Sequence, residues 1–241
     1  MQKSKLHVKP YLSVIMPVFN EQNTVAEVIN KVIEQPMVGE LLIINDGSTD
    51  QTLTILNRVK KNKFIKIISH KENKGKGAAI ISSQANVTFP FVIIQDADLE
   101  LNPNEYIQML HHLIKGEADI VYGSRMINSQ NEFAKGRYLG NKFITYFSNI
   151  FTRLNLTDVA TGYIAMKTTI FKQLKLYENG FSINAEITAK LAVLNYRLVE
   201  VSVTYKPRTK LEGKKIKKRD AIRFAYCIVK YTILEKFKAR N

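Results

Sequence analysis

The sequence predicts an α/β fold in which a mostly parallel sheet is flanked by helices. Three observations predict it. Short apolar runs alternate with segments of helical periodicity, which is the order of strands and crossover helices in a parallel sheet. Several of the apolar runs end in clusters of turn-forming residues. The chain also has 241 residues, of which 45% are hydrophobic, and this is enough for one large core.

The first half of the chain contains the clearest alternation. We expect strands at 12–19, 41–44, 65–68, 91–95 and 120–123. We expect helices at 24–34, 51–60, 74–86 and 105–115. Because each strand is followed by a helix, right-handed crossover connections should join parallel neighbours.

The pattern changes after Arg125. A polar, loop-like segment should be followed by an amphipathic helix, another helix, a strand, a basic loop and a last amphipathic helix. Their expected ranges are 127–137, 139–154, 181–195, 198–205, 206–219 and 222–237. We therefore expect one domain over residues 1–215, followed by a C-terminal amphipathic helix over 216–241 that is a candidate for membrane association.

Charge and cysteine content restrict the partners and the compartment. The formal net charge of +15 favours nucleic acid, anionic lipid or phosphorylated substrates. Cys227 is the only cysteine, so no intrachain disulfide forms, which fits the cytoplasm. The sequence has neither the apolar region of a signal peptide nor an apolar run of about 20 residues. We expect a soluble or peripheral protein, with any membrane anchor supplied by a membrane-protein partner.

Polar turns follow three of the predicted strands. Pro17-Val18-Phe19-Asn20-Glu21 ends the first strand, Asn45-Asp46-Gly47-Ser48 the second, and Asp96-Ala97-Asp98 the fourth. Each turn alone has an ordinary structural explanation, since these are common turn residues. Because parallel strands end at the same edge of a sheet, where open α/β folds bind ligands, the three turns should line one crevice.

Asp96 and Asp98 are the most informative pair. On an extended backbone, side chains two residues apart point to the same face, so both carboxylates can address one hard cation. Such a cation would meet the oxygens of a diphosphate. The alternative is two solvated loop acids, which is the usual meaning of a single short motif.

Taken with the later segments, these turns resemble the family-2 glycosyltransferases of the GT-A fold. The later segments are Gly123-Ser124-Arg125, Arg137-Tyr138-Leu139-Gly140-Asn141, Asp158-Val159-Ala160-Thr161-Gly162-Tyr163, Asn184-Ala185-Glu186-Ile187, Glu200-Val201-Ser202-Val203-Thr204-Tyr205, Lys206-Pro207-Arg208 and Glu212-Gly213-Lys214-Lys215-Ile216. The resemblance covers residues 12–220. Within that family, the succession of segments is similar in particular to the dolichyl-phosphate mannose synthase and dolichyl-phosphate glucosyltransferase branch.

The resemblance implies a donor site at the strand ends. The implied nucleotide-sugar-binding residues are Pro17, Phe19, Glu21, Asp46, Asp96, Ala97 and Asp98. A carboxylate at Asp46 suits the base edge, because it accepts an N–H of uracil or guanine. The family often has aspartate where this chain has Asn45, which keeps an acceptor but removes a charge. Asp96 and Asp98, with Glu100, are expected to hold Mg²⁺ or Mn²⁺, which makes Asp98 catalytic through Lewis-acid chemistry.

The resemblance also implies an acceptor site. The expected phosphate-binding residues are Arg125, Arg137, Arg208 and Lys214. Asp158 matches a catalytic carboxylate beside the acceptor, where it either acts as a base or orients a lysine or arginine. A polyprenyl phosphate has a second pKa near ~6 and therefore needs little deprotonation. Lys74-Gly75-Lys76-Gly77 lacks the spacing of a P-loop, so we interpret it as helix-start glycines near the nucleotide.

The expected activity is inverting transfer of a hexose from a UDP-glucose or GDP-mannose type of donor to a polyprenyl or dolichyl phosphate. It should occur at the cytoplasmic face of a membrane, where the helix at 139–154 and the C-terminal helix form a cationic amphipathic surface. The alternative for these two helices is that their apolar faces pack together as ordinary core.

Two other functions remain open. A transferase of the same fold could act on a glycan or another soluble acceptor, and Asp158 would then be needed as a base for the hydroxyl. A basic nucleic-acid-binding protein is a distant alternative. It is disfavoured because the sequence has no recognisable binding motif and the acidic turns would repel phosphates.

Overall fold

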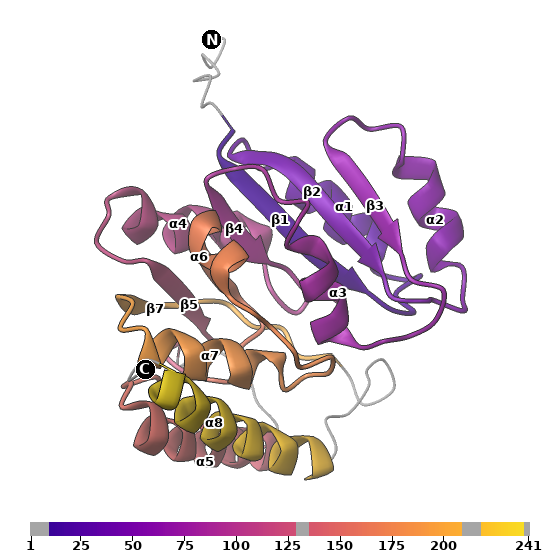
Figure 1. The fold of residues 1–241 in the computed structure, drawn as a ribbon. Helices are drawn as coiled ribbons and strands as arrows, with labels where there is room; N and C mark the ends of the chain where they lie inside the picture. The colour runs from indigo at the N-terminus through magenta and orange to yellow at the C-terminus, as the bar shows by residue number, and fades with distance from the viewer. Residues whose placement is uncertain (1–9, 129–134, 209–217, 239–241) are drawn as a thin grey trace.

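The computed structural model describes residues 10–128, 135–208 and 218–238 (Figure 1). In these residues the sheet has seven strands in the order β3-β2-β1-β4-β6-β5-β7. The strands are β1 (Leu12–Val18), β2 (Val38–Asn45), β3 (Ile65–Ser69), β4 (Phe91–Ile94), β5 (Ile120–Ser124), β6 (Ile164–Lys167) and β7 (Leu198–Ser202). All but β6 run in one direction, and β6 is antiparallel to both of its neighbours. The predicted mostly parallel α/β sheet is confirmed.

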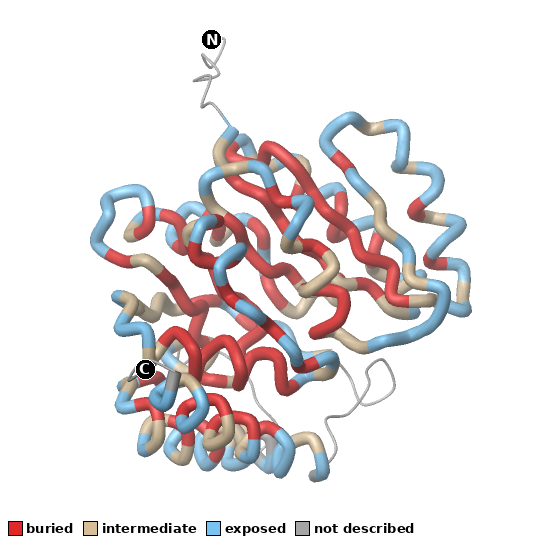
Figure 2. Tube along the Cα trace, in the orientation of Figure 1, coloured by how far each residue is buried: buried red, intermediate tan, exposed pale blue. Residues whose placement is uncertain are grey.

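Helices cover both faces of the sheet. They are α1 (Val25–Ile33), α2 (Thr52–Val59), α3 (Lys76–Ser83), α4 (Tyr106–Ile114), α5 (Lys135–Thr152), α6 (Thr168–Gln173), α7 (Ile183–Val193) and α8 (Lys218–Lys238), with a 3₁₀ turn, η1 (Pro103–Glu105). One core joins the sheet to α1, α2 and α4, and the other joins it to α3, α5, α6, α7 and α8. The central strands are buried along their length, whereas the outer sides of the helices are exposed (Figure 2).

Neighbouring side chains on a strand enter different cores. Val14 packs in the core of α1, α2 and α4, whereas Ile15 packs in the core of α3 and α7. Ile43 and Ile44 on β2 divide in the same way. This alternation follows from the two-residue period of a strand and explains why the strands read as continuous apolar runs.

Helix α8 packs against α7 and α5 (Figure 1). It buries Phe224, Cys227, Ile228 and Tyr231 in the same core as the sheet. The predicted division between residues 215 and 216 lies outside the described residues and stays a prediction. Among the described helices, none combines the length and the apolar character needed to cross a bilayer.

Several element boundaries differ from the sequence predictions. Strand β2 begins at Val38, before the predicted 41, because the buried Glu40 finds partners within the fold. It accepts hydrogen bonds from Ser13 Oγ at 2.6 Å, from the Thr88 backbone N–H at 2.6 Å and from Lys66 Nζ at 2.7 Å. A charged residue interrupts an apolar pattern, and only such tertiary partners allow it inside a strand.

The second half holds the larger differences. Strand β6 and helix α6 were not anticipated, because they have only four and six residues and follow each other directly. Helix α5 begins at Lys135, inside the segment expected to be a loop. Strand β7 ends at Ser202, although Tyr205 forms a further isolated bridge with Leu101.

Candidate functional site

The three predicted turns lie side by side at one edge of the sheet. β1 lies between β2 and β4, with Val18 opposite Asn45 and Ile15 opposite Ile94. The Asp46 backbone N–H donates to Val18 O at 2.8 Å, so that the first two turns leave the sheet together. The expectation that these turns meet at the carboxyl ends of parallel strands is confirmed.

Each turn contains, or is directly followed by, one residue in the left-handed backbone region. The φ angles are 56° at Asn20, 69° at Gly47 and 63° at Leu99. Glycine and asparagine adopt this region readily, whereas leucine does so rarely. Unfavourable backbone conformations persist where the surroundings fix them, and they concentrate at functional sites. Leu99 lies directly after the Asp96-Ala97-Asp98 turn, so this constrained backbone conformation is next to the two carboxylates whose orientation matters.

Direct contacts join the first turn to the third. Thr24 Oγ1 is 2.7 Å from Ala97 O and 2.9 Å from Glu21 Oε2. Pro17 and Phe19 are half-buried beside them. The predicted donor residues Glu21 and Ala97 are thus linked through Thr24, and Ala97, whose side chain is buried, takes part through its backbone oxygen.

Arg208 ties the acidic side chains of this edge together. Its Nη2 donates to Glu21 Oε1 at 2.8 Å and lies 3.3 Å from Asp98 Oδ2. Its backbone N–H donates to Glu100 Oε1 at 3.1 Å. Burial raises the pKa of Glu21, and Arg208 only partly offsets that rise. The predicted phosphate-binding Arg208 thus contacts two predicted nucleotide-binding acids, Glu21 and Asp98, and also Glu100, which with Asp98 is a predicted metal ligand.

Lys76 faces the other aspartate of the pair. Its Nζ lies 2.5 Å from Asp96 Oδ1, and the two side chains are 13% and 27% exposed. The backbone of Gly162 adjoins this ion pair, since a Cβ there would lie 2.5 Å from Asp96 Oδ2 and 2.9 Å from Lys76 Nζ. The sequence indicated Lys76 only as part of a glycine-rich helix start, and its pairing with Asp96 was not predicted.

The chemistry of this cluster fits a hard divalent cation. In the described part of the chain, no group of three or more histidine, cysteine, aspartate or glutamate residues is arranged to hold a metal ion. Asp96 and Asp98 nevertheless present partly exposed carboxylates, and each already has a side-chain cation within 3.3 Å. Mg²⁺ is commonly held by one or two carboxylates together with substrate phosphates, so this pair suits a metal that arrives with a diphosphate.

Asp46 is directed towards the connection between β3 and α3. Its Oδ1 lies 2.6 Å from His70 Nδ1 and accepts from the Lys74 backbone N–H at 2.9 Å, and its Oδ2 accepts from the Gly75 N–H at 2.7 Å. His70 Nε2 in turn lies 2.9 Å from Ser82 Oγ. In this arrangement Asp46 positions the start of α3, and its contact with a base edge stays a prediction. The sequence had no signal for His70, whose partners are distant along the chain.

Arg125 and Asp158 form a buried, two-pronged ion pair. Arg125 Nε donates to Asp158 Oδ2 at 2.7 Å and Nη2 to Oδ1 at 2.9 Å, while Asn141 Nδ2 donates to Oδ1 at 2.8 Å. Burial alone would raise the pKa of Asp158, but the Arg125 charge and these hydrogen bonds lower it below its ordinary value. Arg125 also lies over the Tyr205 ring, 5.2 Å from its centroid. Of the two roles expected for Asp158, this geometry matches the orientation of an arginine.

The other two predicted phosphate-binding residues are less defined. Arg137 lies in the first turns of α5, the helix that also carries Asn141. Its side chain is not among those described. Lys214 falls outside the described residues. The phosphate roles of all four residues stay predictions.

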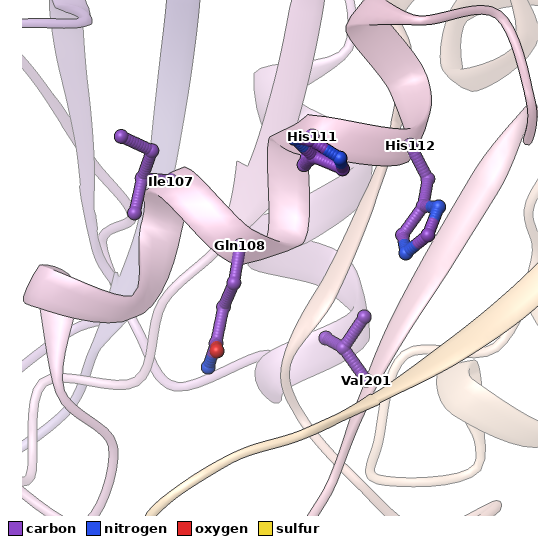
Figure 3. A pocket seen from close by; sticks show the side chains of 5 residues that line it. All are labelled: Ile107, Gln108, His111, His112 and Val201. Carbon is purple, nitrogen blue, oxygen red and sulfur yellow. The ribbon is translucent and has the colours of Figure 1, made fainter.

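A shallow groove of about 300 Å³ lies between α4 and β7 (Figure 3). It is lined by Ile107, Gln108, His111, His112 and Val201. None of these is a predicted site residue. His112 is already paired with Glu117 at 2.7 Å. The strand-end edge, and not this groove, carries the chemistry.

Comparison with known proteins identifies the class. The fold is similar to that of glucosyl-3-phosphoglycerate synthase from Mycobacterium tuberculosis, crystallised with Mn²⁺, UDP and phosphoglyceric acid. The TM-score is 0.69 at 16% identity, over 94% of this chain and 78% of that one, so this likeness concerns the GT-A fold. The family model "Glycosyl transferase family 2" matches residues 13–175. The chain belongs to glycosyl transferase family 2.

Curated relatives indicate which branch of the family the chain resembles. The chain is 27% identical over 238 residues to dolichol-phosphate mannosyltransferase of Pyrococcus furiosus, covering 91% of this chain and 64% of that protein. It is 26% identical over 210 residues to low-salt glycan biosynthesis hexosyltransferase Agl6 of Haloferax volcanii, covering 83% and 49%. The chain thus spans about half to two-thirds of the length of these relatives. The predicted similarity to the lipid-phosphate branch is confirmed.

Proposed function

We propose that the protein transfers a hexose, with inversion, from a nucleotide-diphosphate sugar to a polyprenyl or dolichyl phosphate at a membrane surface. The observation that carries the proposal is the contact of Arg208 with both Glu21 and Asp98. It joins the turn proposed for the nucleotide to the turn proposed for the diphosphate. The named relative acting on dolichol phosphate supports the lipid acceptor.

On the donor side, Pro17, Phe19 and Glu21 would bind the nucleoside, with Asp46 beside them. Asp96 and Asp98, with Glu100, would hold Mg²⁺ or Mn²⁺. When bound, that ion supplies Lewis-acid neutralisation of the charge that develops on the leaving diphosphate. The Arg208 guanidinium lies 3.3 Å from Asp98 and would contact the diphosphate oxygens there, which its planar geometry suits.

On the acceptor side, Arg125 would bind the lipid phosphate, together with Arg137 and Lys214. Asp158 would act as a positioning residue, because the described hydrogen bonds to its carboxylate all come from Arg125 and Asn141. An oxygen of the lipid phosphate forms the new bond to the anomeric carbon. The bond from that carbon to the diphosphate oxygen breaks, and its electron pair leaves with the nucleoside diphosphate. A phosphate with a second pKa of about 6 is largely dianionic at neutral pH, so no base is required.

The exposed apolar side chains of α5 and α8 support a membrane location. Leu139, Phe143, Tyr146 and Ile150 follow a spacing of four, three and four residues, and each is more than half exposed. Such spacing places them on one face of α5.

Helix α8, within the predicted segment 216–241, carries a second exposed set and lies beside α5 (Figure 1). The exposed apolar residues are Ile222, Tyr226, Ile233, Leu234 and Phe237, and Arg219 and Arg223 are exposed on the same helix. Apolar side chains next to basic ones favour the interface of an anionic bilayer. We propose that this surface lies at the cytoplasmic face of a membrane, where a membrane-protein partner would also bind.

Transfer to liposomes tests the acceptor. Liposomes bearing undecaprenyl or dolichyl phosphate should become radiolabelled from UDP-glucose or GDP-mannose in the presence of Mn²⁺ or Mg²⁺. EDTA and Asp98→Asn should each abolish the labelling while the circular dichroism spectrum stays unchanged. Undiminished transfer by Asp98→Asn would overturn the metal assignment. Labelling of soluble glycans alone would replace the lipid acceptor with a glycan.

Liposome flotation tests the membrane surface. The double variant Phe143→Ser/Phe237→Ser should bind anionic liposomes about tenfold more weakly. Full burial of a phenylalanine side chain is worth roughly 1.5–3 kcal/mol, and each of these side chains is expected to be only partly buried in the membrane interface. Phe64→Ser is the matched control, because Phe64 is an exposed phenylalanine that precedes the edge strand β3. Equal binding by the double variant and the control would contradict the assignment.

A further inference from the structure

Lys76 is held at the acidic edge by an unusual backbone arrangement. It lies between Gly75 and Gly77 at the first position of α3. A Cβ on Gly77 would overlap the Glu178 carbonyl oxygen, and Gly75 has a φ of 101°. The Ala78 N–H donates to Asn179 O at 3.0 Å. The start of α3 is therefore packed directly against the turn at 178–180, and this contact fixes where the Lys76 side chain begins.

That turn is itself anchored to α8. Glu178 accepts from Arg223 Nη2 at 3.0 Å and from Tyr231 Oη at 3.0 Å. From the other side, Asp46 accepts from the backbone N–H of Gly75 at 2.7 Å. The backbone that carries Lys76 is thus held from two directions, whereas its four-carbon side chain retains its own rotational freedom.

The end of the Lys76 side chain occupies a position that a metal–diphosphate complex would need. Its Nζ lies 2.5 Å from Asp96 Oδ1, and Gly162 leaves no space for a Cβ beside this pair. A divalent cation that uses Asp96 as a ligand competes with the ammonium group for the same carboxylate. Once displaced, the ammonium group lies beside the diphosphate that accompanies the metal, whose oxygens are strong acceptors.

We propose that Lys76 is a donor-binding residue that exchanges partners. Without donor it neutralises Asp96, and with donor it moves from Asp96 to the diphosphate. It then adds a second positive charge to the leaving group, opposite Arg208. This inference rests on the proposed function, because it needs a metal-bound diphosphate at Asp96.

The exchange predicts effects of opposite sign on two affinities. Removing the lysine charge frees Asp96, so Mn²⁺ alone should bind the donor-free enzyme about fivefold more tightly. The same change removes a charged contact to the diphosphate, so UDP or GDP with saturating Mn²⁺ should bind roughly tenfold more weakly. A lysine that only supported the fold would not shift the two affinities in opposite directions.

The test uses Lys76→Met, which keeps the length of the side chain and removes its charge. Lys74→Met is the matched control, since Lys74 is two residues away and exposed. Mn²⁺ binding to the donor-free full chain is measured by electron paramagnetic resonance. UDP and GDP binding in Mn²⁺ is measured by calorimetry. Lys76→Gln provides a second neutral variant, and thermal denaturation verifies that each variant is folded.

The outcomes separate the two proposals. Tighter Mn²⁺ binding and weaker nucleotide binding in both Lys76 variants, with Lys74→Met unchanged, support the exchange. Lys76 variants that match Lys74→Met, or that weaken both affinities together, overturn it while the proposed function stands. If the unmodified protein binds neither UDP nor GDP in the presence of Mn²⁺, the proposed function fails and the exchange fails with it.

Discussion

Replacing Asp158 by asparagine should destabilise the protein strongly, because it removes the charge that holds Arg125. The Asp158 side chain is fully buried and that of Arg125 is 16% exposed. Asp158 accepts four hydrogen bonds, three of them from Arg125. Asparagine keeps one carbonyl oxygen but turns an amide N–H₂ towards donors, so at least one arginine contact is lost and another becomes repulsive.

The magnitude follows from the loss of one partner of a buried pair. Such losses cost about 3–5 kcal/mol, because the remaining charge stays buried without compensation. The slight exposure of Arg125 allows some rehydration, which favours the lower end, about 3 kcal/mol. For a chain of this length, 1 kcal/mol corresponds to roughly 2–4 °C, so the melting temperature should fall by about 6–12 °C.

Urea denaturation at pH 7 measures the free energy of unfolding, and Asp119→Asn is the control. Asp119 also pairs with an arginine, but Arg197 is 56% exposed, so the control should lose less. Because the pKa of Asp158 is lowered on folding, its stabilisation is fully present above the unfolded value of about 3.9 and is lost as the pH falls below it. The difference between wild type and Asp158→Asn should be constant from pH 7 to 5 and shrink below about pH 4.

A double-mutant cycle with Arg125→Gln distinguishes positioning from base catalysis. If Asp158 acts through Arg125, the activity losses of the two single variants should be similar and the double variant should lose little more. The reasoning is refuted if Asp158→Asn costs less than about 1 kcal/mol, or if its activity loss is independent of Arg125. If the activity loss of Asp158→Asn instead follows the acidic limb of the pH–rate profile, Asp158 acts as a catalytic base.

Three further outcomes are expected. Gly77→Ala should lower the free energy of unfolding in urea by at least about 2 kcal/mol, because the new Cβ would overlap the Glu178 carbonyl oxygen. Gly140→Ala should raise it by up to about 1 kcal/mol, since a Cβ there meets no other atom. Equal effects of the two substitutions would contradict the packing at α3. Burial raises the pKa of Cys227 to about 11, so its thiol should react with Ellman's reagent at pH 8 at least tenfold more slowly folded than in urea, and equal rates would contradict its burial. Glu40→Gln should cost about 1–2 kcal/mol, because the amide N–H₂ that replaces Oε2 cannot accept from Lys66, while the remaining carbonyl oxygen still accepts from Ser13 and Thr88; an unchanged denaturation midpoint would show that the Lys66 contact contributes nothing.

The sequence by itself determined the local elements and the edge at which they meet. Apolar runs alternating with helical patterns defined the parallel sheet, because side-chain period reports local structure directly. The turns at Glu21, Asp46 and Asp96 could be assigned to one edge, because parallel strands must end on the same side. Nothing in the sequence pattern marked β6, whose four residues are too few to show a period.

Only the tertiary structure decided which charged side chains meet. Lys76 and Asp96 are 20 residues apart, Arg125 and Asp158 are 33 apart, and Glu21 and Arg208 are 187 apart. Such pairings depend on strand order and on how closely segments approach, as at Gly162 and Gly77, and periodicity carries no information about either. The sequence therefore located the acidic edge, while the folded chain decided that the basic side chains of Lys76 and Arg208 lie against its two aspartates.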